Sequence, residues 1–141
     1  MLTLNALVAS DSIIIPIQCE FYALEGVSQL VKTINLIKDG LNSSLTIEGV
    51  LLTMADFRTN LTNEVINEIR SYFKNKAYET IIPRNVKLSE APSFGKPVTL
   101  YDSGSLGSKK YRELAKEFLG EKIQEHKSLE NNNLQNTSSD L

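Results

Sequence analysis

The stretch IIPRNVKLSEAPSFGKP, residues Ile81–Pro97, begins as the end of a buried β-strand and continues as a polar loop. Its Pro83 follows a β-branched run, and Pro16 stands at the end of a second such run. A proline offers no N–H to a ladder, so it is tolerated where the pairing of a strand ends. Both prolines are therefore expected at the carboxyl edge of a sheet, where open α/β sheets bind ligands. The loops to inspect for chemistry are those after Ile17, Met54 and Ile82.

The rest of the chain alternates between short apolar runs and helical patterns. Wholly apolar runs are typical of strands in a parallel sheet that is covered on both faces. Their alternation with helices predicts βαβ units with right-handed crossovers, which is an α/β fold. The expected strands are Ser12–Ile17, Ile47–Met54 and Tyr78–Ile82. The expected helices are Leu2–Ala9, one carrying Leu24, Val27, Val31 and Ile34, one carrying Leu61, Val65, Ile69 and Phe73, and a last one carrying Tyr111, Leu114, Ala115, Phe118 and Leu119.

Several residues are expected to begin or end these helices. Gly40 suits the left-handed conformation that follows many helix C-termini. The side chain of Asn60 or Thr62 can cap the third helix, because both types accept a hydrogen bond from a first-turn amide. Ser108 can cap the last helix in the same way. The segment between the third strand and this helix is predicted to be a loop.

Length and composition restrict the class of protein to which the chain can belong. The chain has 141 residues, of which 41% are hydrophobic and 23% are charged, as in an ordinary soluble domain. One domain is expected over residues 1–119, followed by the end of the last helix at residues 120–127. Residues 128–141 lack periodicity and aromatic side chains, which predicts a disordered tail. No apolar run approaches the roughly 20 residues that span a bilayer.

The net charge of −2 is unevenly distributed along the chain. Residues 58–116 hold 11 basic and 6 acidic side chains, whereas the segments on either side are acidic. A basic middle between acidic flanks predicts a local positive face that suits an anionic partner. A solvated surface of mixed charge is the alternative that the charge count alone leaves open.

A second stretch, LTMADFRTNL (Leu52–Leu61), accompanies the one at Ile81–Pro97. Together they resemble the C-terminal half of the ParA/Soj chromosome and plasmid partitioning ATPases, which belong to the deviant Walker A group. The resemblance runs from about Leu2 to Leu119 and implies the C-terminal half of a doubly wound, mostly parallel sheet of the P-loop NTPase type. The chain contains no GxxxxGK(S/T), KGGxGKT or D-x-P-P-S motif. The Walker A and Walker B residues of the family, which hold phosphate and magnesium, are therefore expected to lie outside it.

The resemblance implies that two loops at the carboxyl edge hold the adenine of ATP. Adenine needs a flat apolar sandwich and a few hydrogen bonds to its edge. An arginine here can stack its guanidinium on the base or reach a phosphate. The alternative is that IPRN is only a strand terminus followed by a turn. The candidate nucleotide-binding residues are Thr53, Met54, Ile82, Pro83, Arg84 and Asn85.

The resemblance also implies DNA binding without sequence preference. Its candidate residues are Arg58, Lys87 and Lys96, which follow carboxyl ends of strands, and a lysine at position 87 keeps the charge but not the fork of an arginine. Contacts of this kind release counterions, so the binding must weaken steeply as salt rises. The sequence has no recognition helix or aromatic-interleaved basic stripe, which argues against readout of bases. A solvated charged surface is again the alternative.

The remaining chemical signals indicate structure rather than catalysis. GSLGSKK (Gly104–Lys110) imitates a phosphate loop, but its glycines are too closely spaced for the true motif. Cys19 and His126 are each alone in their type and cannot build a metal site or a Cys–His pair. Cys19 is expected as a small buried group, and Asp56 in a turn. The sequence therefore predicts no catalytic residue and no metal ligand within the chain.

For whole members of the family, the resemblance implies ATP and Mg²⁺ as cofactors, ATP-dependent homodimerisation and ATP hydrolysis. It further implies non-specific DNA and a centromere-binding protein of the ParB/Spo0J type as partners. A cytoplasmic, nucleoid-associated location without a membrane partner follows. Phosphoryl transfer depends on the phosphate loop, so this chain alone, as a truncated form, is expected neither to hydrolyse ATP nor to bind it tightly.

Two other functions remain open. The chain could be a non-catalytic regulator that docks on an intact relative. It could also be a fragment of a MinD-like positioning ATPase, whose basic C-terminal helix lies on anionic lipid, although here the terminus is acidic and rich in Asn and Ser. The resemblance to the partitioning ATPases implies that the phosphate-loop strand lies beside the strand at Ile13–Ile17, so without it this strand is expected to present an open, apolar edge. Such an edge promotes aggregation, so the isolated chain is expected to be poorly soluble or to need a separately supplied N-terminal half.

Overall fold

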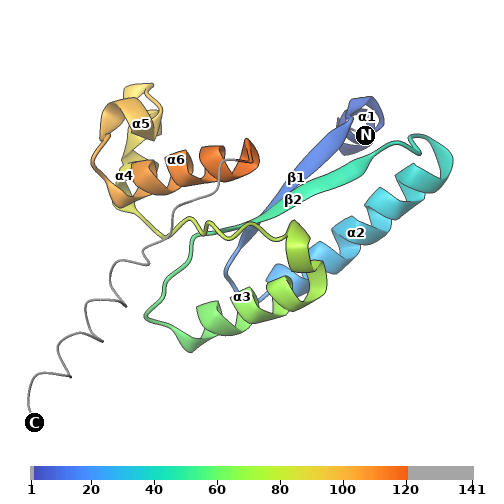
Figure 1. Cartoon of the computed structure of the whole chain (residues 1–141), viewed down its shortest axis with the longest axis horizontal. Coiled ribbons are helices and arrows are strands. Elements are labelled where there is room, and N and C mark those ends of the chain that lie inside the picture. Colours follow the sequence, from blue (N-terminus) through green and yellow to red (C-terminus); the bar gives the residue numbers. More distant parts are fainter. Residues whose placement is uncertain (1, 121–141) are drawn as a thin grey trace, which may run out of the picture.

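The computed structural model describes residues 2–120 and shows an α/β architecture (Figure 1). The predicted helix end at 121–127, the predicted tail at 128–141 and His126 lie outside the described residues. The strands are β1 (Ser12–Gln18) and β2 (Thr46–Thr53). The helices are α1 (Leu2–Ala9), α2 (Ala23–Gly40), α3 (Asn60–Phe73), η1 (Lys74–Lys76), α4 (Val86–Glu90), η2 (Ala91–Phe94), α5 (Val98–Tyr101) and α6 (Leu106–Phe118).

The two strands pair in parallel, and α2 connects them, so the predicted βαβ unit is confirmed. A third extended segment, residues 77–84, runs along the other side of β2. It pairs only through two isolated bridges, Val50 with Ala77 and Ala55 with Pro83. The predicted continuous strand Tyr78–Ile82 is therefore wrong. Its backbone bulges between the two bridges, where the amides of Glu79 and Thr80 donate to a side chain instead of to β2.

Pro16 does not end its strand, in contrast to the prediction, because it lies inside β1. The amide of Cys19 donates to the carbonyl of Thr53, so alternate residues of β1 face β2 and Pro16 faces the opposite way. Within residues 2–120 no strand pairs with that side of β1. The missing N–H of Pro16 therefore costs no ladder bond. Pro83 does stand at the last bridge of its segment, as predicted.

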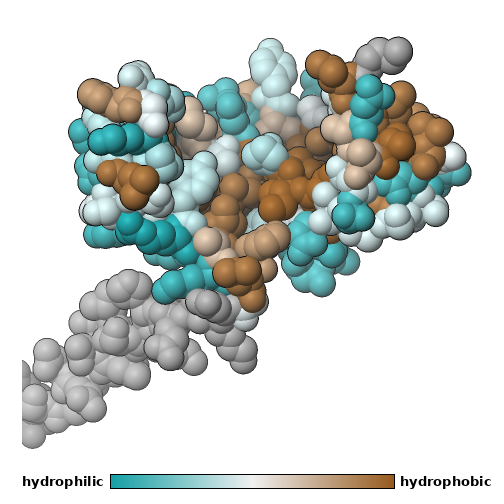
Figure 2. All heavy atoms as spheres, turned by 90° about the horizontal axis from the view of Figure 1, so that it is seen from above, coloured by the Kyte–Doolittle hydropathy of each residue, from teal (hydrophilic) through white to brown (hydrophobic). Residues whose placement is uncertain are grey.

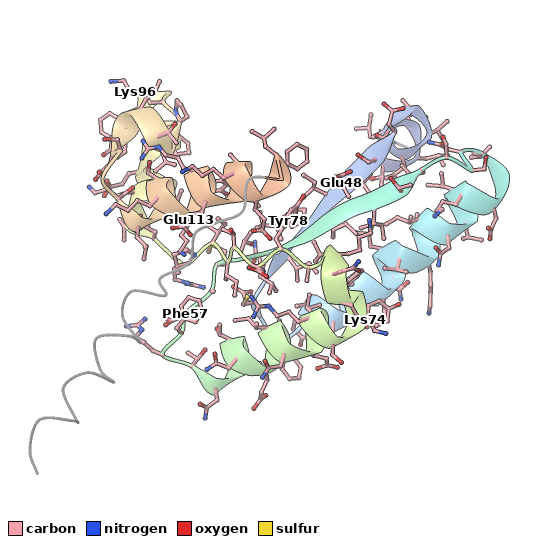
Figure 3. All side chains as sticks on the ribbon, viewed as in Figure 1. Glu48, Phe57, Lys74, Tyr78, Lys96 and Glu113 are labelled. Carbon is pink, nitrogen blue, oxygen red and sulfur yellow. The ribbon has the colours of Figure 1, made fainter. Side chains whose placement is uncertain are left out.

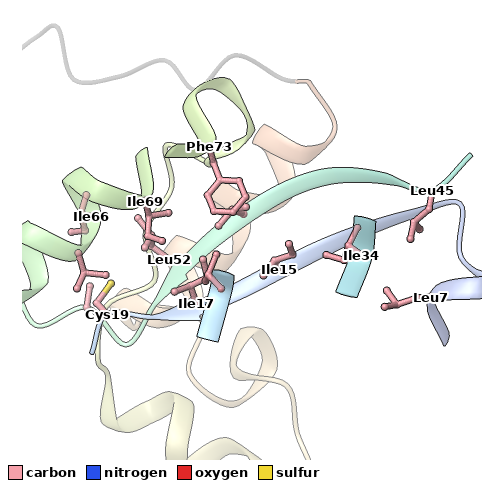
Figure 4. Packing of buried hydrophobic residues seen from close by; sticks show 14 of the residues in the cluster. Leu7, Ile15, Ile17, Cys19, Ile34, Leu45, Leu52, Ile66, Ile69 and Phe73 are labelled. Atoms are coloured by element: carbon pink, nitrogen blue, oxygen red, sulfur yellow. The ribbon is translucent and has the colours of Figure 1, made fainter. Parts of the chain in front are cut away.

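Both faces of β2 are buried, each against a different set of helices. On one face Val50 and Leu52 pack with side chains of β1, α2 and α3, and the arrangement is visible in Figure 4. On the other face Leu51 packs with Tyr78 and Ile82, against partly buried side chains of α4 and α6. The apolar run Val50–Leu52 within this strand is thus explained by burial on both sides. Residues of the larger cluster include Leu7, Ile15, Ile17, Cys19, Ile34, Leu45, Ile66, Ile69 and Phe73.

The helices α4 and α6 cover one face of β2 but leave the same face of β1 exposed to solvent. Ile14 is 44% exposed, and Pro16 beside it is exposed as well. Seen from above, apolar side chains gather between the α4–α6 group and the end that carries α1 (Figure 2). In the described part of the chain, β1 therefore presents both an unpaired edge and an uncovered apolar face. Whether the chain is poorly soluble stays a prediction.

Several predicted helix ends are wrong, because a neighbouring side chain makes the cap. Thr59, not Asn60 or Thr62, caps α3, since its hydroxyl accepts from the amide of Thr62 (3.3 Å). Thr62 is buried instead, and its hydroxyl accepts from the amide of Asp56 (3.3 Å). Ser105, not Ser108, caps α6.

The turn after α2 also differs from the prediction. Gly40 is the last residue of α2, and it is not among the residues with a positive φ. The amides of Leu41 and Asn42 both donate to the carbonyl of Ile37 at 2.8 Å. The side-chain amide of Asn42 then caps the C-terminus of α1, donating most closely to the carbonyl of Ser10 (2.8 Å). The backbone bonds to Ile37 therefore end α2 without the expected left-handed glycine, and Asn42 serves in addition as a cap on α1.

The predicted loop before α6 contains three short helices instead. Asn85 caps α4, since its side-chain oxygen accepts from the amide of Lys87 (3.0 Å). Gly95, at φ 60°, ends η2 in the left-handed conformation that glycine adopts without strain. Each helix is shorter than the window over which hydrophobic periodicity can be recognised, so no pattern indicated them. Among the described residues, no helix is both long and apolar enough to cross a membrane.

We expect Gly49→Ala to destabilise the fold and Gly26→Ala to stabilise it. A Cβ on Gly49 would enter the ring of Tyr78, whereas a Cβ on Gly26 in α2 would meet nothing within 4 Å. The first change should lower the free energy of unfolding by about 1–3 kcal/mol, through overpacking. The second should raise it by about 0.5–1 kcal/mol, through helix propensity. Urea denaturation followed by circular dichroism measures both, and equal effects of the two changes would contradict the packing described.

Candidate functional site

The ends of β2 and of the segment 77–84 are joined at the carboxyl edge of the sheet. The amide of Ile82 donates to the carbonyl of Leu52 (2.9 Å), and the amide of Ala55 donates to the carbonyl of Ile82 (3.2 Å). The amide of Arg84 then donates to the carbonyl of Ala55 (2.9 Å). These bonds bring the first candidate loop, Thr53 and Met54, next to the second, which runs from Ile82 to Asn85.

Met54 turns the chain at the end of β2. It has a φ of 55°, the left-handed conformation that costs a non-glycine residue about 1–3 kcal/mol. The turn adds one residue on the β2 side, because the four residues from Leu52 to Ala55 run beside the three from Ile82 to Arg84. The side chain of Met54 remains 37% exposed at the edge. The backbone strain at the end of β2 therefore falls on Met54, one of the candidate nucleotide-binding residues.

Arg84 connects this edge to the loop after β1. Its Nη2 donates to Oε1 of Glu20 at 3.5 Å, and both side chains are more than half exposed. Glu20 also lines an open cleft of about 470 Å³ between β1 and the start of α2. All three loops singled out by the sequence thus meet at one end of the sheet. An exposed pair of this length contributes little stability, so Arg84 is free to change partner.

Three of the six candidate nucleotide residues, Ile82, Pro83 and Asn85, are already engaged in the fold. The side chain of Ile82 is 2% exposed and packs with Leu51. Asn85 uses its side-chain oxygen to cap α4. Thr53 is partly buried, and its hydroxyl donates to the carbonyl of Ile17 (3.2 Å), leaving its lone pairs available. The exposed side chains of Met54 and Arg84 are the parts best placed for a ligand, whereas Pro83 is buried.

Arg58 lies just beyond Met54, at an exposed turn. Its Nε and Nη2 donate to the two carboxylate oxygens of Asp56 at 2.8 and 2.6 Å. The side-chain bond from Arg58 lowers the pKa of Asp56 to about 2, so the carboxylate stays charged until the pH falls to that range. The same carboxylate also accepts from the amide of Arg58, which confirms the predicted turn role of Asp56.

Lys87 belongs to a second group of polar contacts. Its Nζ donates to Oε2 of Glu90 at 2.8 Å, and the hydroxyl of Tyr101 donates to the same oxygen at 3.0 Å. These two bonds, with that from Lys87 the stronger, lower the pKa of Glu90. The bond to Glu90 raises the pKa of Lys87. Phe94 stacks on Tyr101 with ring centroids 4.9 Å apart.

The three candidate DNA-binding residues do not form one compact patch. Lys96 lies at the outer end of the α4–α6 group, well away from Phe57, the neighbour of Arg58 (Figure 3). It lines a separate cleft of about 340 Å³ together with apolar side chains of η2 and α5. Arg58 and Lys87 are each held by an acidic neighbour. Any anionic partner that touches all three residues must therefore be an extended one.

Sequence reasoning missed the acidic partners. Glu90 follows Lys87 by three positions, a spacing that indicates a helical ion pair once the helix is known. Glu20, Glu117 and Tyr101 carry no such local signal, because their partners are distant in sequence. Cys19 is 4% exposed within the core, as predicted, and burial raises the pKa of its thiol. Residues 2–120 contain no group of three or more His, Cys, Asp or Glu side chains placed to hold a metal.

Comparisons with known proteins match the predicted family. The sporulation initiation inhibitor protein Soj of Bacillus subtilis is 62% identical over 117 residues, which are 83% of this chain and 46% of that protein. The chromosome partitioning protein ParA of Myxococcus xanthus is 57% identical over 119 residues, 84% of this chain and 42% of that protein. The chain thus spans about half the length of the curated relatives it matches. A family model described as an AAA domain matches residues 1–47.

Solved structures agree on the fold. A crystal structure of cobyrinic acid a,c-diamide synthase from Mycobacterium smegmatis has a TM-score of 0.64 and 30% identity, covering 84% of this chain and 41% of that one. The same protein with bound ADP and magnesium has a TM-score of 0.62. The predicted α/β class and P-loop ATPase-like fold are thereby confirmed. The chain belongs to the ParA/Soj family of chromosome partitioning proteins and corresponds to a portion of its members.

Proposed function

We propose that this chain supplies the adenine-contacting and DNA-contacting part of a ParA/Soj-like partitioning ATPase. The proposal rests on the hydrogen bonds that join Ala55 to Ile82 and Arg84, because these bonds align the two candidate loops at one edge. An apolar pair of surfaces with a few polar groups is what a purine requires. A shared edge of this kind supports a binding role more strongly than two unrelated strand ends would.

Each candidate side chain has a distinct task in this proposal. The thioether of Met54 offers an apolar surface, whereas Pro83, which is buried, shapes the second loop from within the fold. The hydroxyl of Thr53 can accept a hydrogen bond from the exocyclic amine of the base. Arg84 exchanges Glu20 for the face of the base or for a phosphate. Asn85 and Ile82 act through the fold, one as the cap of α4 and one as a core residue.

ATP with Mg²⁺ supplies the phosphoryl chemistry when bound to a whole member of the family. The described residues hold no cluster that fits the metal, and no phosphate loop occurs in the sequence. The proposal therefore assigns base recognition alone to this chain. Dimerisation on ATP, a centromere-binding partner and association with the nucleoid in the cytoplasm are proposed for the whole protein, on the strength of its family.

DNA contact is proposed through phosphates. Arg58 and Lys96 lie at exposed positions beyond the carboxyl edge, Lys87 lies at a partly exposed one, and the sequence of that region is basic overall. Arg58 must leave Asp56, and Lys87 must leave Glu90, before either can neutralise a phosphate. Exposed ion pairs are weak enough for such an exchange. The expected binding is weak, independent of sequence and strongly dependent on salt.

Adenosine, added to the ¹⁵N-labelled chain, is expected to shift the amide resonances of Met54 and Arg84. The affinity should be in the millimolar range, because a nucleoside buries few atoms and lacks phosphates. Tripolyphosphate, which has no base, should leave Met54 unchanged. Arg84→Ala should weaken the adenosine shifts, whereas Lys32→Ala, an exposed change on α2, should not. If adenosine shifts resonances only at other sites, or none at all, base recognition by this edge is disproved.

Asp56→Asn is expected to strengthen binding to duplex DNA, and Arg58→Ala to weaken it. Asparagine keeps the oxygen that accepts from the amide of Arg58 but removes the charge that neutralises its guanidinium. Arg58→Ala should also reduce the slope of log K against log salt by about 0.9, the value for one phosphate contact. Fluorescence anisotropy with two duplexes of unrelated sequence measures both effects, with Lys32→Ala as the matched control.

Either of two results would contradict the DNA proposal. The first is a strong preference for one duplex, because phosphate contacts carry no sequence information. The second is equal affinity of the Asp56→Asn variant and the unchanged chain, which would show that Arg58 takes no part.

A second candidate function is docking on a longer relative, and the open side of β1 favours it. This strand presents an unpaired edge and an exposed Ile14 within the described residues. Addition of the chain to the chromosome-partitioning ATPase Soj of Treponema pallidum should then lower its ATPase rate. Ile14→Lys should abolish this inhibition by charging the edge, whereas Leu36→Lys, at a 73% exposed position of α2, should not. An unchanged ATPase rate would exclude this function.

A further inference from the structure

Glu117, on the last turn of α6, binds two consecutive backbone amides of the segment 77–84. Its Oε1 accepts from the amide of Glu79 at 2.6 Å, and its Oε2 accepts from the amide of Thr80 at 3.0 Å. A carboxylate near the C-terminus of a helix is disfavoured by the helix dipole. Hydrogen bonds to a charged acceptor are roughly twice as strong as neutral ones and offset that cost. The two bonds to the amides of Glu79 and Thr80 therefore account for a carboxylate at this end of α6.

The amide of Thr80 is available because the ladder is interrupted, whereas the amide of Glu79 would face away from β2 even in a regular ladder. The amide of Tyr78 donates to the carbonyl of Val50, and the next ladder bond runs from Ile82 to Leu52. The five residues from Tyr78 to Ile82 therefore run beside the three from Val50 to Leu52. A regular parallel ladder would place the amide of Thr80 on the carbonyl of Leu52. Glu117 accepts that amide instead, so its carboxylate stabilises the bulge.

A second helix holds the bulge from the other side of the sheet. The Nη2 of Arg70 in α3 donates to the carbonyl of Glu79 (3.1 Å). The hydroxyl of Thr80 is buried without a hydrogen-bond partner among the described residues, which destabilises the bulge. The bonds from Arg70 and to Glu117 offset this cost. Figure 3 places Tyr78, at the start of the bulge, between α6 and the sheet. The bulge is therefore held by side chains rather than by the ladder.

The position of the candidate nucleotide loop depends on this bulge. Ile82, which follows it, sets the register of the segment through its bond to Leu52, and Arg84 continues that register at Ala55. The geometry points to Glu117 as a positioning residue for the segment Ile82–Asn85, which it controls by holding the amides of Glu79 and Thr80. The nucleotide as ligand rests on the function proposed above, whereas the link from Glu117 to Ile82 and Arg84 does not.

Amide hydrogen exchange on the full ¹⁵N-labelled chain tests this link. In Glu117→Ala the amides of Glu79 and Thr80 should exchange about ten- to hundredfold faster, as expected for the loss of bonds to a charged group. The amides of Ile82 and Arg84 should accelerate with them. The amide of Cys19, which donates to Thr53 in the core, should keep its rate.

Two further variants separate positioning from stability. Glu117→Gln keeps one side-chain oxygen as an acceptor, so it should restore protection to one of the two amides and give intermediate rates at Ile82 and Arg84. Glu113→Gln removes a charge from the same helix, where Glu113 pairs with Lys110 (2.6 Å), and should leave all these rates unchanged.

The possible results distinguish this inference from the proposed function. Wild-type rates at Ile82 and Arg84 in Glu117→Ala would overturn the positioning role, even if Glu79 and Thr80 lose protection. Equal acceleration of all amides, Cys19 included, would overturn it as well, because Glu117 would then act on global stability.

Adenosine-induced shifts at Arg84 should weaken in Glu117→Ala. If the unchanged chain shows no such shifts while the exchange results are as expected, the positioning role stands and base recognition fails.

Discussion

The burial of β2 on both faces is the constraint on which the rest of the described structure depends. Val50 and Leu52 face α2 and α3, and Leu51 faces the layer that contains α6. Burial of one such side chain contributes about 1.5–3 kcal/mol, so each layer of helices is held mainly by what it covers on this strand. Gly49 belongs to the same constraint, because only a residue without a Cβ lets the ring of Tyr78 lie against β2.

Two irregularities beside β2 together shape the candidate site. The segment 77–84 carries extra residues in its bulge, and the left-handed turn at Met54 restores part of the difference on the β2 side. The alignment of the two loops at the edge is the result of both. Side chains from both layers, Arg70 of α3 and Glu117 of α6, hold the bulge in place. Core packing, a strained turn and two polar contacts thus position a few exposed groups, as functional sites commonly require.

The electrostatics of the site are more local than the charge count suggests. The sequence predicts a basic middle, yet Arg58 and Lys87 are each paired with a carboxylate only a few positions away. Such pairs lower the positive potential near each group without changing the fold, since both partners are partly exposed. Arg84 pairs across the site with Glu20, from a different loop. The positive face therefore depends on which of these pairs a ligand can open.

The sequence by itself determined the α/β class, the two regular strands and the edge at which the loops meet, because hydrophobic periodicity acts over a few neighbouring residues and Pro83 marks the end of its segment. Pro16 did not mark a strand end, since it lies inside β1. The family and the candidate residues at Thr53 and Pro83 followed from two local motifs. Only the tertiary structure decided the bulge at Glu79, the cap at Thr59 and the part played by Glu117. Glu79 and Glu117 are 38 positions apart, and no local pattern relates them. Their contact exists because α6 packs over β2, so the folded arrangement of helices and sheet, rather than any propensity of the residues, sets the geometry of the site.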